Sequence, residues 1–326
     1  MSLCGKPFLL LCCLLAQYLN CVSPEPACED TTHRHATVKE FTCSNFTSAD
    51  DFEKYFKHDE DYADLWFVLK DSNIDYLPPG VLAGTRASLL EFNNVKLKSF
   101  TAPDSNATAF AGLENSVRRI AFTHKSSVPS SWEMLKPLTK LEELVFFEMS
   151  LLNLTRDFNK LPKTLKKVVI IRSTIGFVDE DWMASLPNLE NVRIQSSTLD
   201  RFSRKMLPRP AKHLRKLTIG DSSLTSLPKD FGADFPAMIQ VNLRQNLINT
   251  FEKASLSPLN NNKTVVVLSG NPVQCDCKIS FLLDFPETWV YPQCSSPESL
   301  AGTFLRNVTT EQLNCENDGR LSRADP

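Results

Sequence analysis

The side chains best suited to chemistry in this sequence are cysteines, histidines and a few carboxylates. Six cysteines follow residue 23 and lie near the two ends of the chain: Cys28, Cys43, Cys275, Cys277, Cys294 and Cys315. In an exported protein an even, end-clustered set indicates disulfides that join the terminal segments. Metal binding by Cys28 with His33 and His35 is the alternative, and we rank it lower because an oxidising compartment favours disulfides.

The sequence contains no recognisable catalytic set. Glu143 and Glu148 flank one apolar segment, but in an extended strand they would lie about 16 Å apart. Glycosidase carboxylates need a separation of roughly 5–9.5 Å. No two of the ten glycines have G-x-G spacing, and Gly-Lys-Ser/Thr, G-x-S-x-G and H-E-x-x-H motifs are absent from the sequence. Loops that bind dinucleotides or nucleotide phosphates are therefore excluded, and we expect a non-enzymatic protein without a cofactor or metal.

Composition and the terminal segments predict a secreted protein. The 326 residues have a formal net charge of −2, which argues against a nucleic-acid partner because phosphates attract basic surfaces. Lys6 precedes an apolar run over residues 7–15 that is too short to cross a bilayer, so we expect residues 1–23 to be a cleaved signal peptide. No second long apolar stretch follows, and the tail 316–326 is polar, so no membrane anchor is expected.

Five Asn-x-Ser/Thr sequons predict glycosylation in the secretory pathway. They begin at Asn45, Asn106, Asn153, Asn262 and Asn307. One sequon alone is weak evidence, whereas five behind a signal peptide indicate a glycoprotein.

The middle of the chain is a repeat with a period of about 24 residues. An apolar-x-apolar pattern followed by two further apolar positions starts at residues 67, 90, 120, 144, 168, 192, 217, 241 and 266. Each copy predicts one short strand, a turn and a return across the opposite side, so that successive strands pair in parallel. Large side chains that follow the strands would close the core from that side: Trp132, Phe158, Trp182, Met206 and Phe231. The longer gap after the second copy predicts a protruding loop that carries Asn106.

This pattern resembles the leucine-rich repeat family over residues 63–274. The resemblance implies an α/β repeat fold, a solenoid whose curved parallel β-sheet forms its concave face. In this family an Asn at a ladder position usually bonds the backbone between turns. The corresponding residues here are Ser72, Val95, Lys125, Met149, Ser173, Ser197, Ser222, Asn246 and Asn271. Because only the last two match, we expect less regular turns around the second to fourth copies.

Residues 275–315 resemble the cysteine-rich C-terminal cap of extracellular leucine-rich repeat proteins. The resemblance rests on the C-x-C pair, the C-x-x-P sequence and the leucines and glycine around them. It implies disulfides Cys275–Cys294 and Cys277–Cys315, although spacing alone leaves three pairings open.

Residues 24–62 are expected to form the N-terminal cap, in which Cys28 and Cys43 bracket a hairpin. A helical stripe of Phe52, Tyr55 and Phe56 would then face the first repeat. The Cys-Ser-Asn-x-Thr-Ser segment before this helix is similar to arthropod secreted leucine-rich repeat proteins, among them the non-catalytic subunit of a shrimp luciferase. That similarity implies a binding subunit rather than luminescence chemistry.

The repeat phase predicts which side chains lie on the outward, concave face of the strands. Four apolar residues adjoin there: Val145, Phe147, Val169 and Ile171. Charged residues surround them: Lys167, Arg172, Arg193, Glu143 and Glu148. An exposed apolar patch with a polar rim is typical of a partner site, and none of the sequons falls on an outward strand position. We therefore predict a protein-binding site here; packing on its own loop or on another copy is the alternative.

These features favour a secreted, glycosylated, non-catalytic module that binds a protein ligand in recognition, in adhesion or as an accessory subunit. The second interpretation is a structural or self-associating matrix protein, in which the chain forms a homo-oligomer. A monodisperse chain at micromolar concentration would favour the first. An enzyme is the third and least supported class.

Overall fold

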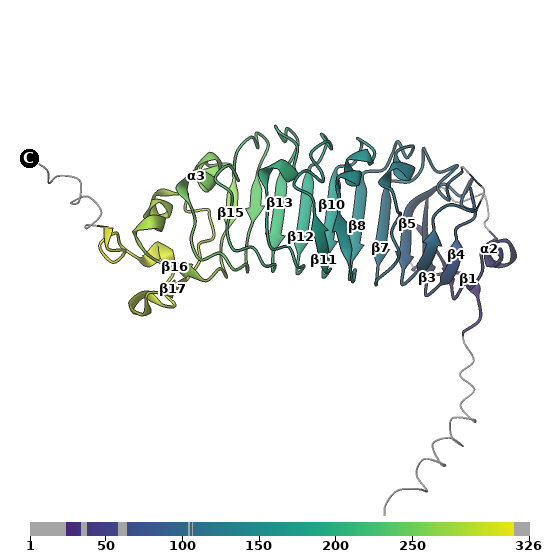
Figure 1. Cartoon of the computed structure of the whole chain (residues 1–326), viewed down its shortest axis with the longest axis horizontal. Helices are drawn as coiled ribbons and strands as arrows, with labels where there is room; N and C mark the ends of the chain where they lie inside the picture. Colours follow the sequence, from purple (N-terminus) through teal and green to yellow (C-terminus); the bar gives the residue numbers. More distant parts are fainter. Residues whose placement is uncertain (1–23, 34–37, 58–63, 104, 106, 316–326) are drawn as a thin grey trace, which may run out of the picture.

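The computed structural model describes residues 24–33, 38–57, 64–103, 105 and 107–315 (Figure 1). The expected signal peptide over residues 1–23, the tail 316–326, His35 and the sequon residue Asn106 lie outside the described residues.

Eleven strands form one sheet that runs along the molecule in chain order (Figure 1). They are β1 (Ala27–Asp30), β2 (Lys39–Ser44), β3 (Leu65–Lys70), β5 (Ala87–Asn93), β7 (Arg119–Thr123), β8 (Glu143–Phe147), β10 (Lys167–Ile171), β12 (Asn191–Gln195), β13 (Lys216–Gly220), β14 (Gln240–Asn242) and β15 (Val265–Val267). Neighbours from β2 to β15 pair in parallel, and β1 pairs with β2 antiparallel. Each predicted copy supplies one strand, as the apolar-x-apolar pattern requires.

The rest of each solenoid turn consists of short strands and brief helical segments. Three two-stranded parallel sheets are formed by β4 (Asn73–Tyr76) with β6 (Lys96–Ser99), β9 (Leu152–Leu154) with β11 (Ile175–Val178), and β16 (Val273–Gln274) with β17 (Cys294–Ser296). The α-helices are α2 (Asp50–Tyr55) and α3 (Lys253–Leu256). The 3₁₀ segments are η1 (Trp132–Leu135), η2 (Arg156–Lys160), η3 (Arg204–Met206), η4 (Ser257–Leu259), η5 (Cys277–Asp284), η6 (Glu298–Leu300) and η7 (Leu305–Asn307).

The core is a continuous row of apolar side chains between the main sheet and these segments. Phe92, Phe122 and Phe146 come from successive strands and stack with ring centroids 5.4 and 5.9 Å apart. The five predicted anchors of the opposite side are each at most 4% exposed: Trp132, Phe158, Trp182, Met206 and Phe231. This burial confirms the second wall of the core.

The third turn departs from the repeat phase by one residue. Ser126, and not Lys125, occupies the ladder position: its Oγ donates to the Phe92 carbonyl (2.8 Å) and accepts from the Val95 amide (2.9 Å). Lys125 is exposed. His124 and Lys125 have consecutive positive φ angles of 52° and 62°, so this turn contains one extra residue. The assignment of Lys125 was wrong, while the expected irregularity of this region is observed.

The fourth copy contains a second departure. The repeat pattern that starts at Leu144 predicts inward side chains at Phe146, Leu151 and Leu154. The Leu151 side chain, however, is 64% exposed, and Leu152 is buried instead. Leu152 pairs with Ile175 of β11, and a bulge at Gly176 then restores the register. A shift of one residue reverses the face of a strand to which each side chain belongs, which explains the exchange of the two leucines.

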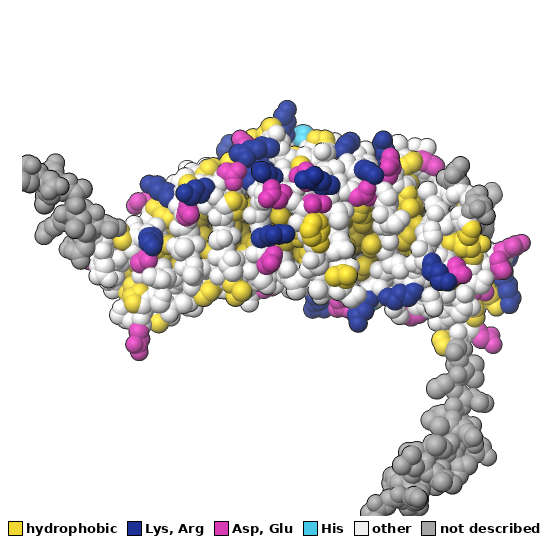
Figure 2. All heavy atoms as spheres, viewed as in Figure 1, with side chains coloured by type: hydrophobic (Ala, Val, Ile, Leu, Met, Phe, Trp, Pro, Cys, Tyr) yellow, Lys and Arg dark blue, Asp and Glu magenta, His cyan; other side chains and the backbone are white. Residues whose placement is uncertain are grey.

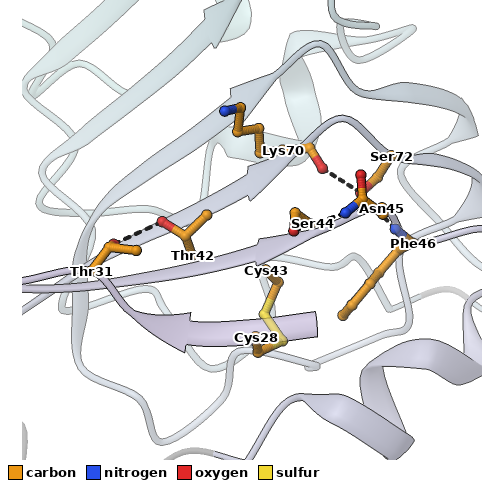
Figure 3. The surroundings of a disulfide bond; sticks show 9 residues. All are labelled: Cys28, Thr31, Thr42, Cys43, Ser44, Asn45, Phe46, Lys70 and Ser72. Carbon is orange, nitrogen blue, oxygen red and sulfur yellow. Dashed lines mark hydrogen bonds between the residues drawn. A yellow bond between two sulfur atoms is a disulfide. The ribbon is translucent and has the colours of Figure 1, made fainter. Parts of the chain in front are cut away.

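Disulfides hold both caps. Cys28 on β1 is bonded to Cys43 on β2, beside a hydroxyl pair formed by Thr31 and Thr42 (Figure 3). Helix α2 buries Phe52, whose ring lies 4.8 Å from that of Phe46, two residues after β2. Because Cys28 is in a disulfide, it supplies no thiolate for the alternative metal site.

The C-terminal cap contains the disulfides Cys275–Cys294 and Cys277–Cys315. These are the pairs that the family resemblance implied. Segment η5 lies between them and buries Ile279. The cap thereby covers the apolar end of the last repeat.

Candidate binding face on the concave sheet

The four apolar residues of the predicted patch lie on two adjacent strands. Val145 and Phe147 belong to β8, and Val169 and Ile171 belong to β10. Val145 is directly opposite Val169, and Phe147 is opposite Ile171. The intervening residue of β8, Phe146, points into the core, so the four side chains share the outward face and adjoin as the repeat phase predicted.

The patch is less exposed than the sequence suggested. Val145 and Val169 are only 7% and 6% exposed, and they form a small cluster with Ala121 of β7 against which Ile171 packs. Phe147 and Ile171 are half-buried. Strands lie about 4.8 Å apart, so side chains in register shield one another. The accessible apolar surface therefore consists of Phe147 and Ile171 beside a floor of three buried residues.

Figure 2 shows hydrophobic side chains over the middle strands of the sheet, with charged side chains around them. The expectation of one open apolar patch was wrong for its two valines. A smaller accessible surface with a polar surround takes its place.

Polar residues enclose Phe147 at the carboxyl end of β8. The His124 ring lies 5.6 Å from the Phe147 ring, and the Arg172 guanidinium lies 5.7 Å from it. Glu148 joins the two, with its carboxylate 3.5 Å from both His124 Nε2 and Arg172 Nη1. His124, Glu148 and Arg172 all have positive φ angles, of 52°, 55° and 50°, in successive turns. Their equivalent backbone positions bring these side chains together, and we call the four residues the Phe147 cluster.

A second charged group lies at the amino end of the same strands. Glu143 Oε1 is 2.7 Å from Lys167 Nζ, and Glu143 Oε2 is 4.0 Å from Arg119 Nε. Beside them Lys166 bonds Glu142 at 2.8 Å, and this hydrogen bond raises the pKa of Lys166. Exposed pairs of this kind contribute about 0–1 kcal/mol each, so a partner can replace them at little cost.

Two surface hollows lie at the opposite ends of these strands. The hollow at the carboxyl end has a volume of ≈ 550 Å³ and includes His124 and Glu148 in its lining. The hollow at the amino end has a volume of ≈ 430 Å³ and includes Arg119, Glu143 and Lys167. Phe147, at the end of β8, adjoins the first hollow through His124 and Glu148, whereas the second hollow lies at the opposite end of the strand.

The strand register places Arg193 beside Val169, but its guanidinium bonds a residue outside the patch. Its Nε donates to Gln195 Oε1 (2.8 Å), and Gln195 in turn donates to Asp221 (2.8 Å). Arg193 is therefore tied to a polar chain along the next strands. Lys167 and Arg172 do lie beside the apolar residues as predicted, where they contact Glu143 and Glu148.

Sequence reasoning left three contributors out of the site: Ala121, Arg119 and His124. Ala121 completes the floor, Arg119 contacts Glu143 and His124 contacts Phe147. All three come from the third copy of the repeat, whose pattern is degraded. The alternation of side chains in that copy, in which Ile120 and Phe122 point inward, could have identified Arg119 and Ala121 as outward residues.

The described sequons avoid the outward face of the main sheet. Asn153 lies on β9, Asn262 precedes β15 and Asn307 belongs to η7, and all three are exposed. Asn45 follows β2 and is half-buried, and its Nδ2 donates to Ser44 Oγ at 3.2 Å (Figure 3).

Two features are absent from the described part of the chain. No three or more His, Cys, Asp or Glu side chains gather there to hold a metal ion. None of the helices in that part of the chain has the length and apolar character needed to cross a membrane.

Comparisons with known proteins found no matching family model. The chain is 28% identical to Toll-like receptor 9 of Mus musculus over 174 residues, which are 51% of this chain and 16% of the receptor. It is 21% identical to the Oplophorus-luciferin 2-monooxygenase non-catalytic subunit of Oplophorus gracilirostris over 264 residues, 68% of this chain and 73% of that subunit.

Among solved structures, human 5T4 (trophoblast glycoprotein) superposes with a TM-score of 0.53 at 16% identity, over 90% of this chain and 100% of that one. This likeness concerns the fold. Together with the parallel sheet and the terminal disulfides, it identifies a leucine-rich repeat solenoid with disulfide-bonded caps. The chain spans only 16% of the length of Toll-like receptor 9 and 28% of that of Toll-like receptor 2.

Proposed function

We propose that this leucine-rich repeat protein is a secreted, glycosylated, non-catalytic module that binds a protein ligand on its concave sheet. The contact would centre on Phe147 and Ile171, above the floor formed by Ala121, Val145 and Val169. The function would be recognition, adhesion or that of an accessory subunit.

The observation that carries this proposal is the composition of the face itself. Phe147 and Ile171 offer apolar area next to the floor of Ala121, Val145 and Val169, and charged groups and a hollow border this apolar surface toward each end of the strands. Protein interfaces have this arrangement, with an apolar centre inside a polar rim. The half-buried state of Phe147 favours it as an anchor, because its neighbours already restrict its rotamers and little conformational entropy remains to be lost.

The charges of the rim suit reversible recognition. Glu148 already balances Arg172 and contacts His124, and Glu143 balances Lys167. A partner that presents its own carboxylates or cations can exchange with these pairs. Such an exchange changes selectivity and association rate more than it changes affinity.

The relatives support a binding role without catalysis. By their names, one is a receptor and the other is the non-catalytic subunit of a monooxygenase. The absence of described sequons from the outward face of the sheet also supports the proposal, because a bulky glycan would obstruct a protein partner.

The central test is the substitution Phe147→Asp. The partner is first captured from the extracellular fluid of the source organism with the immobilised chain and is then produced in pure form. Loss of an anchor at the interface centre costs about 2 kcal/mol or more, which corresponds to a roughly 30-fold higher Kd at 1.4 kcal/mol per factor of ten. Isothermal titration calorimetry or surface plasmon resonance measures this change.

Leu247→Asp is the matched control, since Leu247 is 55% exposed and lies outside the main sheet. The control should bind with unchanged affinity, and circular dichroism should show the same fold for both variants. Ile171→Asp should weaken binding as Phe147→Asp does. If neither concave substitution alters the Kd, the site lies elsewhere, with the loop near Asn106 as the next candidate.

Self-association is the competing function. Sedimentation equilibrium at micromolar concentration distinguishes the two, since a monomer supports the module and a homo-oligomer abolished by Phe147→Asp supports the matrix protein.

A further inference from the structure

A second apolar surface lies outside the concave face. Two of the strongly exposed large hydrophobic side chains among the described residues, Leu151 (64%) and Phe177 (49%), lie on neighbouring turns beside the sequon residue Asn153. We call Leu151 and Phe177 the lateral patch. Water-exposed apolar area of this kind is unfavourable unless something covers it.

The register of β9 and β11 places the sequon between the two hydrophobic residues. Leu152 and Leu154 of β9 are buried, so Asn153 points outward from that strand. Its partner across the strand pair is Phe177. Paired strands are about 4.8 Å apart, which brings the Phe177 ring within reach of the first sugar on Asn153.

Gly176 brings the patch and the sequon together. A Cβ atom at this residue would lie 2.4 Å from Leu151 Cδ1 and 3.0 Å from Asn153 Oδ1. The side chains of Leu151 and Asn153 therefore both lie over the backbone of Gly176. Any larger residue would push them apart, so the bulge at Gly176 lets the leucine and the amide share one surface.

We propose that an N-linked glycan on Asn153 folds back over Leu151 and Phe177 and covers the lateral patch. Glycosylation joins Asn153 Nδ2 to the anomeric carbon of an oligosaccharide carried on a polyprenyl diphosphate. The amide loses one proton, and the diphosphate leaves with the electron pair of the broken bond. The donor is the lipid-linked oligosaccharide of the secretory pathway.

The chemistry of the two surfaces is complementary. One face of a pyranose ring presents C–H groups, which have slight positive charge and pack on the negative face of an aromatic ring. Phe177 supplies that ring and Leu151 extends the apolar area. Because the sugar is covalently attached, it meets the patch at a high effective concentration and needs little intrinsic affinity.

The glycan gives the lateral patch a role opposite to that of the concave binding face, and this role rests on the glycosylation included in the proposed function. The lateral patch would be permanently covered by sugar and closed to proteins, while the sheet stays open.

The first experiment compares the wild-type chain with Thr155→Ala, both secreted from a eukaryotic host. Thr155→Ala destroys the sequon but keeps Asn153 and the patch, and the Thr155 side chain forms no capping hydrogen bond with η2. Glycopeptide mass spectrometry should find Asn153 occupied in the wild type. Loss of the glycan should lower the Tm by about 2–4 °C and increase fluorescence of an environment-sensitive hydrophobic dye. Enzymatic removal of the glycan from the wild type should reproduce both changes.

Asn262→Gln is the matched control, because it removes an exposed sequon in the turn before β15. It should leave the dye signal unchanged. An unmodified Asn153 in the secreted chain would overturn the proposal.

The second experiment asks whether the glycan acts through the patch. In the background Leu151→Ser with Phe177→Ser, the Thr155→Ala substitution should no longer change the Tm. An equal fall in Tm in both backgrounds would mean that the glycan does not contact the patch, which would refute the inference whatever the outcome at the concave face.

Discussion

The last two copies of the repeat and the copies before them hold their turns together in different ways. In the C-terminal half, Asn246 reaches across the repeats: its Nδ2 donates to the carbonyls of Ile219 (2.8 Å) and Leu243 (2.9 Å), and its Oδ1 accepts from the Leu224 amide (3.2 Å). In the seven copies before that of Asn246, serine takes this place wherever the ladder residue is polar. Ser197 Oγ donates to the carbonyl two residues before it (3.0 Å) and accepts from the Ser173 amide (3.1 Å).

The difference is one of reach. The amide of Asn246 binds a carbonyl of the preceding strand, a carbonyl of its own turn and an amide of the preceding turn. The hydroxyls of Ser173 and Ser197 each make one contact across the turns and one local contact. The amides of Val95 and Met149, whose own side chains form no hydrogen bonds, donate to the hydroxyls of Ser126 and Ser173 of the following turns. A serine ladder therefore suffices even where every second member is apolar, but each step is held by fewer bonds.

Among the changes that test this comparison, loss of the disulfides should lower the free energy of unfolding the most. The Cys277–Cys315 bond closes a separation of 38 residues, and the Cys28–Cys43 bond closes one of 15. On the chain-entropy account, removing the first by Cys277→Ala with Cys315→Ala should cost about 4 kcal/mol, and removing the second about 3 kcal/mol. Urea unfolding followed by circular dichroism measures both. A larger cost for removing Cys28–Cys43 would show that the N-terminal cap, next to the turns held by serine, depends more on its disulfide.

The substitution Asn246→Ala should have the next largest effect. It removes the Asn246 partner of the Ile219 carbonyl and of the Leu224 amide, while the Leu243 carbonyl keeps its bond to Asn271 Nδ2 (2.9 Å). This loss should lower the free energy of unfolding by about 3 kcal/mol. Asn246→Ser is the informative companion, because it imposes the serine type of turn on the C-terminal half. Asn246→Ser should lower the free energy of unfolding by less than Asn246→Ala does. Equal losses would mean that the longer reach of asparagine accounts for the whole effect.

Two serines give the smallest effects and separate contacts across turns from local ones. Ser126 is buried and bonds the Val95 amide and the Phe92 carbonyl of the preceding repeat, so Ser126→Ala should cost about 2 kcal/mol. Ser222 is half-buried, and its Oγ bonds only the Gly220 carbonyl of its own turn, at 3.1 Å. Ser222→Ala should cost no more than about 0.5 kcal/mol. Similar values for the two serines would show that contacts across turns contribute no more than local ones.

Much of the fold could be predicted from the sequence because its determinants are local and repeated. The alternation of side chains along a strand depends only on the chain itself, so residues such as Phe146 and Val145 were assigned to opposite faces correctly. A period of about 24 residues over nine copies fixes which strands are neighbours. The anchors from Trp132 to Phe231 followed from the same phase.

The parts that could not be predicted depend on contacts between copies. Val145 was assigned to the right face, yet only its neighbours on β7 and β10 make it inaccessible. The apolar pattern tolerates shifts of one residue. It therefore could not reveal the extra residue in the turn at His124 or the exchange of Leu151 for Leu152. Arg193 was assigned to the outward face beside the patch, but its guanidinium donates a hydrogen bond to Gln195.

The periodic order of apolar residues thus determined the solenoid, its sheet and the outward set of side chains, because backbone geometry converts sequence spacing into direction. Tertiary structure alone decided which of those side chains are accessible and how they are paired. Burial and charge pairing on this face are set by residues about 24 positions away, one strand over, and their shapes and rotamers are not encoded in the period.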